Sequence, residues 1–433
     1  MQRIWSTEVR SHIGERVKLA GWLHRLRKLG SISFLILRDG KGTVQVVLED
    51  HEAIEKLAGA YGETVMTVEG LAVAETQAPG GVEIRQPRVE LLSISKSPPP
   101  FDLFHPVLKE QLPAILDHAP IALRHPRHRA IFQLASAAME GFRSSLRAMD
   151  FVEIQTPKIV GSATEGGANV FHLDYFGRPA YLAQSPQFYK QAMVGVFERV
   201  FEVGPVFRAE PHDTPRHLNE YVSLDAEMGF IDDHHTVMQV LTATIRGMLE
   251  ALCGEQGAAL ALLEVQTPRL PEEIPSIHFA EALDLICRET GEDAREEPDL
   301  APAHERFLGD WARREYGSEF IFVTGYPMRK RPFYTCPDPV QPAYSNSFDL
   351  LFRGLELVTG GQRLHRYEDY LTAMEARGIS PEYLGSYLEA FKYGMPPHGG
   401  FAIGLERFIA RLIGAQNIRE TALFPRDLNR LTP

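Results

Sequence analysis

Apolar and polar residues alternate over short stretches through the amino-terminal part of the chain. Five stretches, 17–25, 31–39, 42–49, 63–75 and 82–95, are rich in β-branched or alternating apolar residues, a pattern typical of strands. Turn-forming residues separate them at Asp39-Gly40, Lys41-Gly42 and Pro79-Gly80-Gly81. This many strands in so short a segment predict a small closed β-barrel.

Among small closed barrels, the OB-fold is the commonest module that binds oligonucleotides, and we expect that fold over residues 1–103. A proline-rich tract, SPPPF at 97–101, is stiff and extended, so it begins what we interpret as a linker. The linker, or hinge, is placed at 104–124, and a second domain is placed at 125–433.

The second domain shows a helical pattern at its start. Met139, Phe142, Leu146 and Met149 recur at three- and four-residue steps, which predicts a helix with one apolar face over 128–150. Further helices are predicted at 234–253 and 366–377. Strands are predicted at 151–159, 170–175, 199–208, 221–230, 319–324, 346–358 and 400–404. This mixture indicates an α+β domain on a largely antiparallel sheet flanked by helices.

Composition excludes several classes of protein. Hydrophobic residues make up 44% and charged residues 24%, which is typical of a globular protein. No apolar run reaches the ~18–20 residues that span a bilayer, and the first residues lack a signal-peptide pattern, so we expect a cytoplasmic protein. The three cysteines are far apart, which argues against a disulfide framework or a structural zinc site.

The net charge of −12 argues against a protein that holds nucleic acid by bulk attraction. The charge is uneven, however, because residues 1–50 carry nine Lys/Arg against five Asp/Glu. This excess indicates either a local contact with an anionic partner or merely a solvated face.

Opposed charges are densest in PVFRAEPHDTPRHLNEYVSLDAE, residues 205–227. Residues two apart on a strand face the same side, so Arg208 and Glu210 are expected to share a face. Arg216 and His217 follow a turn-rich loop and are placed to fold back over them. An arginine fork matches the geometry of a phosphate group, which favours a nucleotide triphosphate as ligand.

On the return strand, Asp225 and Glu227 also share a face. For the segment taken alone, a cross-strand ladder of ion pairs is the plainer interpretation.

Two further segments add oxygen ligands and cations. In NSFDLLFRGLELVTGGQR, residues 346–363, Asp349 and Glu356 are seven apart, with Gly354 expected to bend the strand between them. Two hard carboxylates beside a triphosphate make a candidate magnesium site. Arg363 follows a glycine pair that lets a ligand approach the backbone. Downstream, Arg407 is expected in the first turn of a helix, and Gly404 leaves room beside it.

A small-molecule pocket is indicated by two other segments. SATEGGANVF, residues 162–171, is a glycine-hinged loop with one carboxylate, Glu165, and a loop of this kind can close over a ligand. YLAQSPQFYKQ, residues 181–191, offers Gln187 and Lys190 beside aromatic residues. Taken singly, Lys190 is equally a solvated charge on a helix.

Together these segments resemble the class II aminoacyl-tRNA synthetases. Three class motifs occur in order: the long helix and the strand ending at Pro157, then FRAE followed by RHLNE, then GLERF. Within the class, TEGGANVF, QSPQFYKQ, RAEPHDTPRHLNE, GGQRLHR, KYGMPPHGG and FPRD resemble aspartyl-tRNA synthetases of the archaeal-type branch. The resemblance covers nearly the whole chain.

The resemblance implies an ATP-dependent aspartate–tRNA ligase that uses Mg²⁺, with roles for individual residues. It implies contacts to the nucleotide by Arg208, Glu210, Arg216, His217, Leu218, Glu356, Gly404 and Arg407, of which Arg208, Glu210 and Arg407 are catalytic. It implies contacts to aspartate by Glu165, Gln187, Lys190, Arg208, Asp225, Thr359 and Arg363. The implied metal ligands are Asp349, Glu356 and Thr359, where Thr359 replaces a serine that is common in the family.

Elementary electrostatics agrees with aspartate as the substrate. Arg363 and Lys190 facing one pocket favour a side-chain carboxylate, and an amide would leave their charge uncompensated. The substrate carboxylate then attacks the α-phosphorus of ATP, so that no side-chain nucleophile is required.

The barrel would bind the anticodon of a tRNA. Splayed bases stack on aromatic residues, and Phe34 is the candidate stacking platform, although it is otherwise a barrel-core residue. Arg27 and Gln45 are candidates for backbone and base-edge contacts. His24 and Pro79 stand where strict members of this branch tend to carry tryptophan and lysine, which implies a relaxed enzyme that charges tRNA(Asp) and tRNA(Asn). A partner amidotransferase would then convert the misacylated product.

Two alternatives stay open from the sequence. An asparaginyl-tRNA synthetase shares the barrel and the motifs, although PHDTPRHLNE and QSPQFYKQ favour aspartate. A non-catalytic RNA-binding relative would keep the fold, although the catalytic residues that can be placed are present. The first class motif usually forms a dimer interface, so the resemblance also implies a homodimer.

Overall fold

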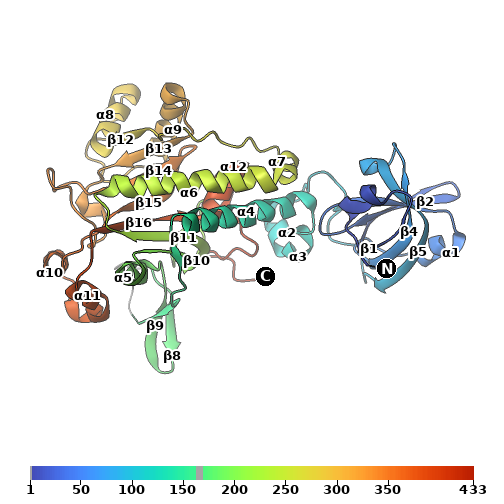
Figure 1. The fold of residues 1–433 in the computed structure, drawn as a ribbon, viewed down its shortest axis with the longest axis horizontal. Coiled ribbons are helices and arrows are strands. Elements are labelled where there is room, and N and C mark those ends of the chain that lie inside the picture. Colours follow the sequence, from blue (N-terminus) through green and yellow to red (C-terminus); the bar gives the residue numbers. More distant parts are fainter. Residues whose placement is uncertain (1, 162–168) are drawn as a thin grey trace. The chain divides into compact units, whose positions relative to one another are not determined.

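The five alternating stretches at the amino terminus form a closed five-stranded barrel, as predicted (Figure 1). The strands are β1 (Arg16–Leu29), β2 (Ile32–Arg38), β3 (Thr43–Leu48), β4 (Val65–Ala74) and β5 (Val82–Ser93), in the spatial order β1-β2-β3-β5-β4. Alternate residues such as Leu19, Val46 and Val68 fill the interior and are almost fully buried. The barrel also carries η1 (Ser6–His12), α1 (His51–Lys56) and η2 (Pro79–Gly81), which the sequence pattern did not predict.

The computed structural model describes residues 2–161 and 169–433, and the chain divides into two compact units, 1–126 and 127–433. The first unit contains the barrel and the segment predicted as a linker, which includes α2 (Leu112–Asp117) and α3 (Ala119–Ala122). Within this unit, Arg124 and Arg38 both bond the buried carboxylate of Glu63, at 2.9 Å and 2.7 Å. The end of the linker segment is therefore tied to the barrel.

The second unit is built on an eight-stranded sheet in the order β12-β13-β14-β15-β16-β11-β10-β6. Its neighbours are antiparallel except for β12–β13 and β10–β6, so the prediction of a largely antiparallel sheet is confirmed. The strands are β6 (Val152–Glu153), β10 (Arg199–Phe207), β11 (Glu220–Gly229), β12 (Ser276–His278), β13 (Phe320–Thr324), β14 (Ser347–Phe352), β15 (Leu355–Gln362) and β16 (His398–Gly404). A small sheet of β7 (Ile159–Val160), β9 (Arg178–Leu182) and β8 (His172–Tyr175) stands apart from it.

Helices surround the large sheet (Figure 1). The predicted helices are present as α4 (Pro126–Ala148), α6 (His234–Glu255), α10 (Tyr367–Glu375) and α12 (Leu405–Ile413). The others are α5 (Gln187–Phe197), α7 (Gly257–Leu263), α8 (Phe279–Thr290), α9 (Pro302–Tyr316) and α11 (Gly385–Lys392), together with η3 (Met328–Lys330), η4 (Pro381–Leu384) and η5 (Ile418–Thr421). In the described part of the chain, no helix has the length and hydropathy needed to cross a membrane.

Two strand predictions were wrong in detail. Residues 346–358 form a hairpin of two strands and not one bent strand, because Arg353 and Gly354 adopt positive φ angles of 48° and 70° and reverse the chain. Residues 151–159 are mostly irregular, and only the short β6 and the start of β7 fall within them.

The two faces of the sheet differ in chemistry because side chains alternate along each strand. On β11, Leu224, Ala226 and Met228 face the main core, where they pack with residues of α4 and α6. The intervening Asp225 and Glu227 face the other way. The sheet therefore presents one apolar face to helices and a polar face that can form a site.

Candidate active site

A cavity of about 580 Å³ lies in the second unit, and residues from β11, β15 and β16 line it. It collects thirteen residues that sequence analysis singled out: Gln187, Lys190, Arg208, Glu210, Arg216, His217, Leu218, Asp225, Glu356, Thr359, Arg363, Gly404 and Arg407. These residues span more than two hundred positions of the chain. Glu165, also predicted at this site, lies outside the residues that the structure describes.

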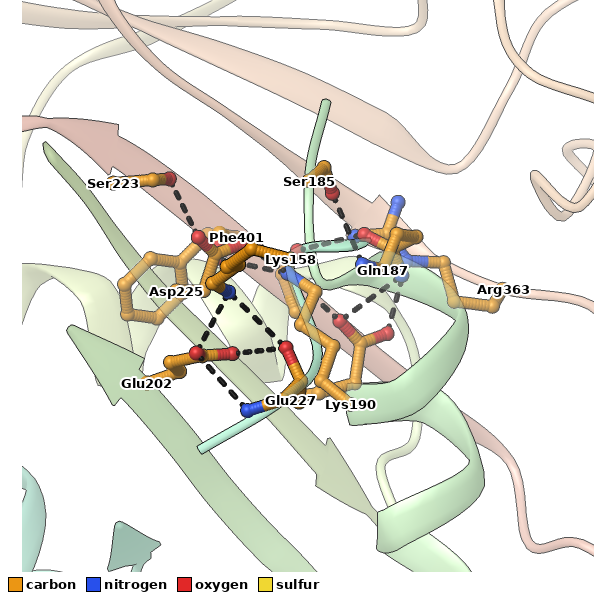
Figure 2. Close-up of polar contacts among 12 residues, drawn as sticks. Lys158, Ser185, Gln187, Lys190, Glu202, Ser223, Asp225, Glu227, Arg363 and Phe401 are labelled. Carbon is orange, nitrogen blue, oxygen red and sulfur yellow. Dashed lines mark hydrogen bonds and ion pairs between the residues drawn. The ribbon is translucent and has the colours of Figure 1, made fainter. Parts of the chain in front are cut away.

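One part of the cavity, which we call the buried end, is lined by Gln187, Lys190, Asp225 and Arg363, and we include in it Glu227, which contacts two of them from beside the cavity. Lys190 lies on α5 and is 1% exposed, so it is not a solvated helix charge. Its ammonium group lies 3.0 Å from an oxygen of Asp225 and 3.3 Å from one of Glu227 (Figure 2). Ser223 donates a hydrogen bond of 2.5 Å to the second oxygen of Asp225.

Arg363, which directly follows β15, approaches the carboxylate of Glu227. Its Nε donates to Glu227 at 3.0 Å, and its Nη2 donates to the carbonyl of Gly400 at 3.1 Å. Burial alone would raise the pKa of Glu227, but Arg363 and Lys190 outweigh burial and hold that pKa below its usual value. Gly400 makes this packing possible, because a Cβ atom there would overlap the backbone oxygen of Ala226 and the carboxylate of Glu227.

In the buried end, the positive charges of Lys190 and Arg363 are therefore balanced by two carboxylates, and sequence analysis missed one of these four charged groups. Glu227 was recognised only as sharing a face with Asp225. The sequence held a signal for the role of Glu227. It lies two residues from Asp225 on one strand, and the two predicted cations of the pocket need carboxylate partners, because buried charges must be paired.

A polar network behind the buried end was also missed. Gln191 donates to Tyr370 Oη and to His398 Nε2, each at 3.0 Å, and accepts from Tyr387 Oη at 3.0 Å. Burial lowers the pKa of His398 to about 4, so its ring is neutral at neutral pH. The carbonyl of His398 accepts from the backbone N–H of Arg363 at 2.9 Å, and the network thereby braces the strand segment that carries Arg363.

The other part, the open end, comprises Arg208, Glu210, Arg216, Glu356 and Arg407. β10 ends at Phe207, so Arg208 and Glu210 lie on the following loop and not on a strand as predicted. Their side chains still meet, with 4.0 Å between Arg208 Nη1 and Glu210 Oε1. The side chain of Arg208 is 42% exposed.

Glu305 on α9 organises the rest of the open end, although sequence analysis did not identify it. Its buried carboxylate accepts two bonds from Arg216 Nη2, at 2.9 Å and 3.1 Å, and another from the backbone N–H of Glu356 at 2.9 Å. Arg407 lies in the first turn of α12, as predicted, and donates to the carbonyl of Glu356 at 3.0 Å. Arg216, Glu356 and Arg407 are thus already assembled.

Two of the three predicted metal ligands lie on the cavity wall. Thr359 Oγ1 is 3.3 Å from Glu356 Oε1, and a carboxylate beside a hydroxyl is an oxygen donor set suited to a hard cation such as Mg²⁺. Asp349 does not line the cavity and accepts from Arg331 at 3.0 Å. Burial, opposed by Arg331, raises the pKa of Asp349 to about 7. Glu356 and Thr359 therefore fit a Mg²⁺ site, whereas Asp349, which is bonded to Arg331 away from the cavity wall, does not.

The barrel residues predicted to bind tRNA are placed in the first unit. Phe34 is half-buried and lies outside the barrel core, which disfavours the interpretation as a core residue. It pairs across strands with Arg27. Gln45 donates to Glu83 at 2.9 Å.

The two residues tied to tRNA discrimination have distinct settings. His24 sits at a break in the β1–β2 register between Leu23 and Arg25, and such a bulge re-aims a side chain. Burial and then Arg38 lower its pKa to about 4. Pro79 starts the turn between β4 and β5.

Comparisons with known proteins agree with this geometry. Residues 113–428 match the family model "tRNA synthetases class II (D, K and N)", and residues 17–92 match "OB-fold nucleic acid binding domain". An aspartate–tRNA(Asp/Asn) ligase of Thermus thermophilus is 46% identical over 100% of both chains, and one of Deinococcus radiodurans is 43% identical over 100% of this chain and 99% of its own. An aspartate–tRNA(Asp) ligase of Pyrococcus abyssi is 39% identical over 99% of each chain.

Among solved structures, the asparaginyl-tRNA synthetase of Pyrococcus horikoshii in complex with asparaginyl-adenylate superposes with a TM-score of 0.93 at 30% identity, and all of both chains is covered. A putative aspartyl-tRNA synthetase of Leishmania major has a TM-score of 0.89 at 29% identity, covering 100% of this chain and 95% of its own. The barrel, the antiparallel catalytic sheet and the converging charges thus have one common explanation, and the chain belongs to the class II tRNA synthetases of the D, K and N group.

Proposed function

We propose that the chain joins L-aspartate to tRNA in two steps at the expense of ATP, and that it accepts both tRNA(Asp) and tRNA(Asn). The observation that carries the proposal is the convergence of Lys190 and Arg363, two buried cations, on one carboxylate beside the cavity. The names of the relatives from Thermus thermophilus and Deinococcus radiodurans support the same activity.

The charge balance of the buried end explains selection of aspartate. Asp225 and Gln187, with Glu165, would surround the substrate ammonium group. The substrate side-chain carboxylate would then enter between Lys190 and Arg363, while Glu227 keeps both cations in place. With Asp225 turned to the substrate ammonium group, the two cations would share Glu227 alone. Asparagine would then leave one desolvated positive charge without a partner, which costs more than the ~1–3 kcal/mol of an unpaired neutral group.

Activation of aspartate needs alignment and neutralisation of charge. One oxygen of the substrate α-carboxylate attacks the α-phosphorus of ATP, the bond to the bridging oxygen breaks, and pyrophosphate leaves. Arg208 would contact the α-phosphate, and Arg216, His217 and Arg407 the remaining phosphates and the adenine. Mg²⁺ held at Glu356 and Thr359, with Asp349 behind them, would neutralise phosphate charge.

Transfer to tRNA completes the reaction. A terminal ribose hydroxyl of the tRNA attacks the carbonyl carbon of the mixed anhydride, the bond from that carbon to the phosphate oxygen breaks, and AMP leaves, with its phosphate accepting the hydroxyl proton. The barrel would hold the anticodon, with Phe34 as a stacking platform and with Arg27 and Gln45 as polar contacts.

His24 and Pro79 support relaxed tRNA specificity, because a tryptophan ring and a cation would restrict the anticodon more than histidine and proline do. The product on tRNA(Asn) would then need an amidotransferase. We further infer that the chain works as a homodimer in the cytoplasm, as the family resemblance implies.

The decisive experiment is charging of purified tRNA(Asp) and tRNA(Asn) with radiolabelled aspartate. Comparable yields on both tRNAs are expected, and labelling of tRNA(Asp) alone would remove the relaxed specificity. A His24→Trp/Pro79→Lys double variant is expected to lose charging of tRNA(Asn) while it keeps tRNA(Asp).

An asparaginyl-tRNA synthetase is the second candidate, favoured by the structural likeness to the Pyrococcus horikoshii enzyme. Pyrophosphate exchange with each amino acid separates the two. Exchange that depends on asparagine and not on aspartate would refute the proposal, whereas no exchange with either would favour a non-catalytic relative.

A further inference from the structure

The loop between β10 and β11 carries Arg216 and His217 into the cavity, yet much of it faces solvent. Pro211, His212 and Asp213 are exposed. Within the loop, Thr214 Oγ1 and His217 Nδ1 share a hydrogen bond of 2.6 Å. A loop of this kind must be ordered before its side chains can hold a ligand, and that ordering opposes binding.

A buried arginine from a distant part of the chain holds this loop. Arg419 on η5 is 8% exposed. Its Nη2 donates to Asp213 Oδ1 at 2.6 Å, and its Nη1 donates to the carbonyl of Thr214 at 3.2 Å. Its Nε donates to Asp427, so one guanidinium joins the loop to the carboxyl-terminal segment. Charge-assisted bonds to a buried guanidinium are stronger than bonds on an open surface.

The carboxyl-terminal segment makes further bonds to the same loop. Asn429 Nδ2 donates to Asp213 Oδ2 at 2.8 Å, and the carbonyl of Arg426 accepts from the backbone N–H of Asn219 at 2.8 Å. Both carboxylate oxygens of Asp213 are therefore engaged, although its side chain is 50% exposed.

The segment that carries Arg419 is in turn fixed to α12. Thr421 Oγ1 donates to the carbonyl of Glu406 at 2.9 Å, one residue before Arg407. The backbone N–H of Ile418 donates to the carbonyl of Pro215 at 2.9 Å, and Ile418 packs with Leu218 and Ala410. The loop with Arg216 and the helix with Arg407 thus meet at η5.

We propose that Arg419 is a positioning residue for nucleotide binding, and that it sets the loop at 209–219 against α12 so that Arg216 and Arg407 face the same phosphates. The proposal rests on the proposed function for the identity of the nucleotide as ATP. Arg419 does not line the cavity, and its guanidinium donates to Asp213, Thr214, Asn417 and Asp427.

The test uses Asp213→Ala, chosen because the side chain of Asp213 is 50% exposed, together with Arg419→Lys and the double variant. Isothermal titration with Mg·ATP is expected to show affinity about tenfold weaker in each single variant, from loss of one charge-assisted bond. The affinity of the double variant for ATP is expected to be at most about twofold weaker than that of either single variant, because both changes break the same contact between Arg419 and Asp213. Asp232→Ala, an exposed carboxylate outside the cavity, is the matched control and should bind ATP as the unaltered chain does.

A positioning role also predicts that the KM for aspartate stays within about twofold and that the melting temperature of Asp213→Ala stays within about 2 °C. Unchanged affinity for ATP in Asp213→Ala would overturn the proposal. A parallel loss of affinity for ATP and aspartate with a lower melting temperature would also overturn it, since that result indicates a purely structural role. Titration with ATP does not require aspartate activation, so failure of the proposed function would be seen separately, in the exchange assay of the unaltered chain.

Discussion

Two buried glutamates near opposite ends of the cavity have pKa values that are shifted in opposite directions. Glu227, at the buried end, is 0% exposed, and Arg363 and Lys190 overcome the effect of burial and lower its pKa. Glu406, beside Arg407 at the open end, is 7% exposed, and burial raises its pKa to about 7. Its oxygens accept the backbone N–H groups of Glu406 itself and of Val222, the latter at 3.1 Å. The pKa shifts differ in sign because Arg363 and Lys190 form ion pairs with Glu227, whereas Glu406 forms no ion pair in the part of the chain that the structure describes.

The comparison shows how one cavity divides two tasks. The buried end has its charges paired and braced before any substrate arrives, which suits discrimination between an acid and its amide. At the open end the side chains of Arg208, Arg216 and Arg407 are 42%, 31% and 29% exposed, which suits a large charged ligand that brings its own counter-ions. Under the proposed function, selectivity for aspartate would therefore reside at the buried end, and affinity for the nucleotide would be spread over the open end.

The largest effect is expected from Lys190→Met at the buried end. Removal of one partner leaves Asp225 and Glu227 with a single cation, and breaking a buried pair costs about 3–5 kcal/mol. The kcat/KM for aspartate in pyrophosphate exchange should fall by roughly 10²–10³-fold. Affinity for ATP should stay within about threefold, and Lys392→Met on the surface of α11 is the matched control. An equal loss of ATP affinity would erase the division between the two ends.

A smaller effect is expected from Arg407→Gln at the open end. The side chain is partly exposed and shares the nucleotide with other arginines, so its loss should weaken ATP binding by about tenfold. The KM for aspartate should not change. A larger effect on aspartate than on ATP, measured by exchange at saturating second substrate, would contradict the assignment of Arg407.

The smallest effect on activity, and a distinct effect on stability, is expected from Glu406→Gln. The folded chain holds a proton on Glu406 more tightly than the unfolded chain, whose carboxyl has a pKa near 4.5. Stability from this group is therefore lost as pH rises from about 4.5 to about 7. One pKa unit corresponds to ~1.4 kcal/mol. As pH rises through this range, the free energy of unfolding of Glu406→Gln should therefore increase by on the order of 2–3 kcal/mol relative to that of the unaltered chain.

Urea unfolding at pH 5 and pH 8 measures this difference, with the exposed Glu382→Gln as control. A constant gap between variant and unaltered chain at the two pH values would show that Glu406 is not protonated in the folded state. The contrast between Glu227 and Glu406, with pKa values shifted in opposite directions, would then be contradicted.

Much of this architecture was predictable because it follows local periodicity. The barrel strands and the helices α4 and α6 repeat apolar residues at steps that only one secondary structure satisfies. The hairpin at Arg353 and Gly354 was not predicted, because a non-glycine residue with positive φ leaves little trace in a pattern of apolar positions.

The sequence allowed prediction of most residues that line the cavity. It did not allow prediction of the hydrogen bonds and ion pairs that hold them in place. Motif spacing located Lys190, Arg363 and Arg407, whereas Glu305 and Arg419 carry no motif and reach the site through tertiary folding alone. Their partners lie 89 and 206 positions away in sequence. No local pattern can indicate contacts of that range.

The most direct test of the central claim is a crystal structure of the chain with a non-hydrolysable aspartyl-adenylate analogue. We predict the side-chain carboxylate of the ligand within about 3.5 Å of both Lys190 Nζ and the guanidinium of Arg363, with Glu227 still bonded to Arg363. A ligand carboxylate that contacts neither cation, or contacts them only after Glu227 has left the site, would contradict the account.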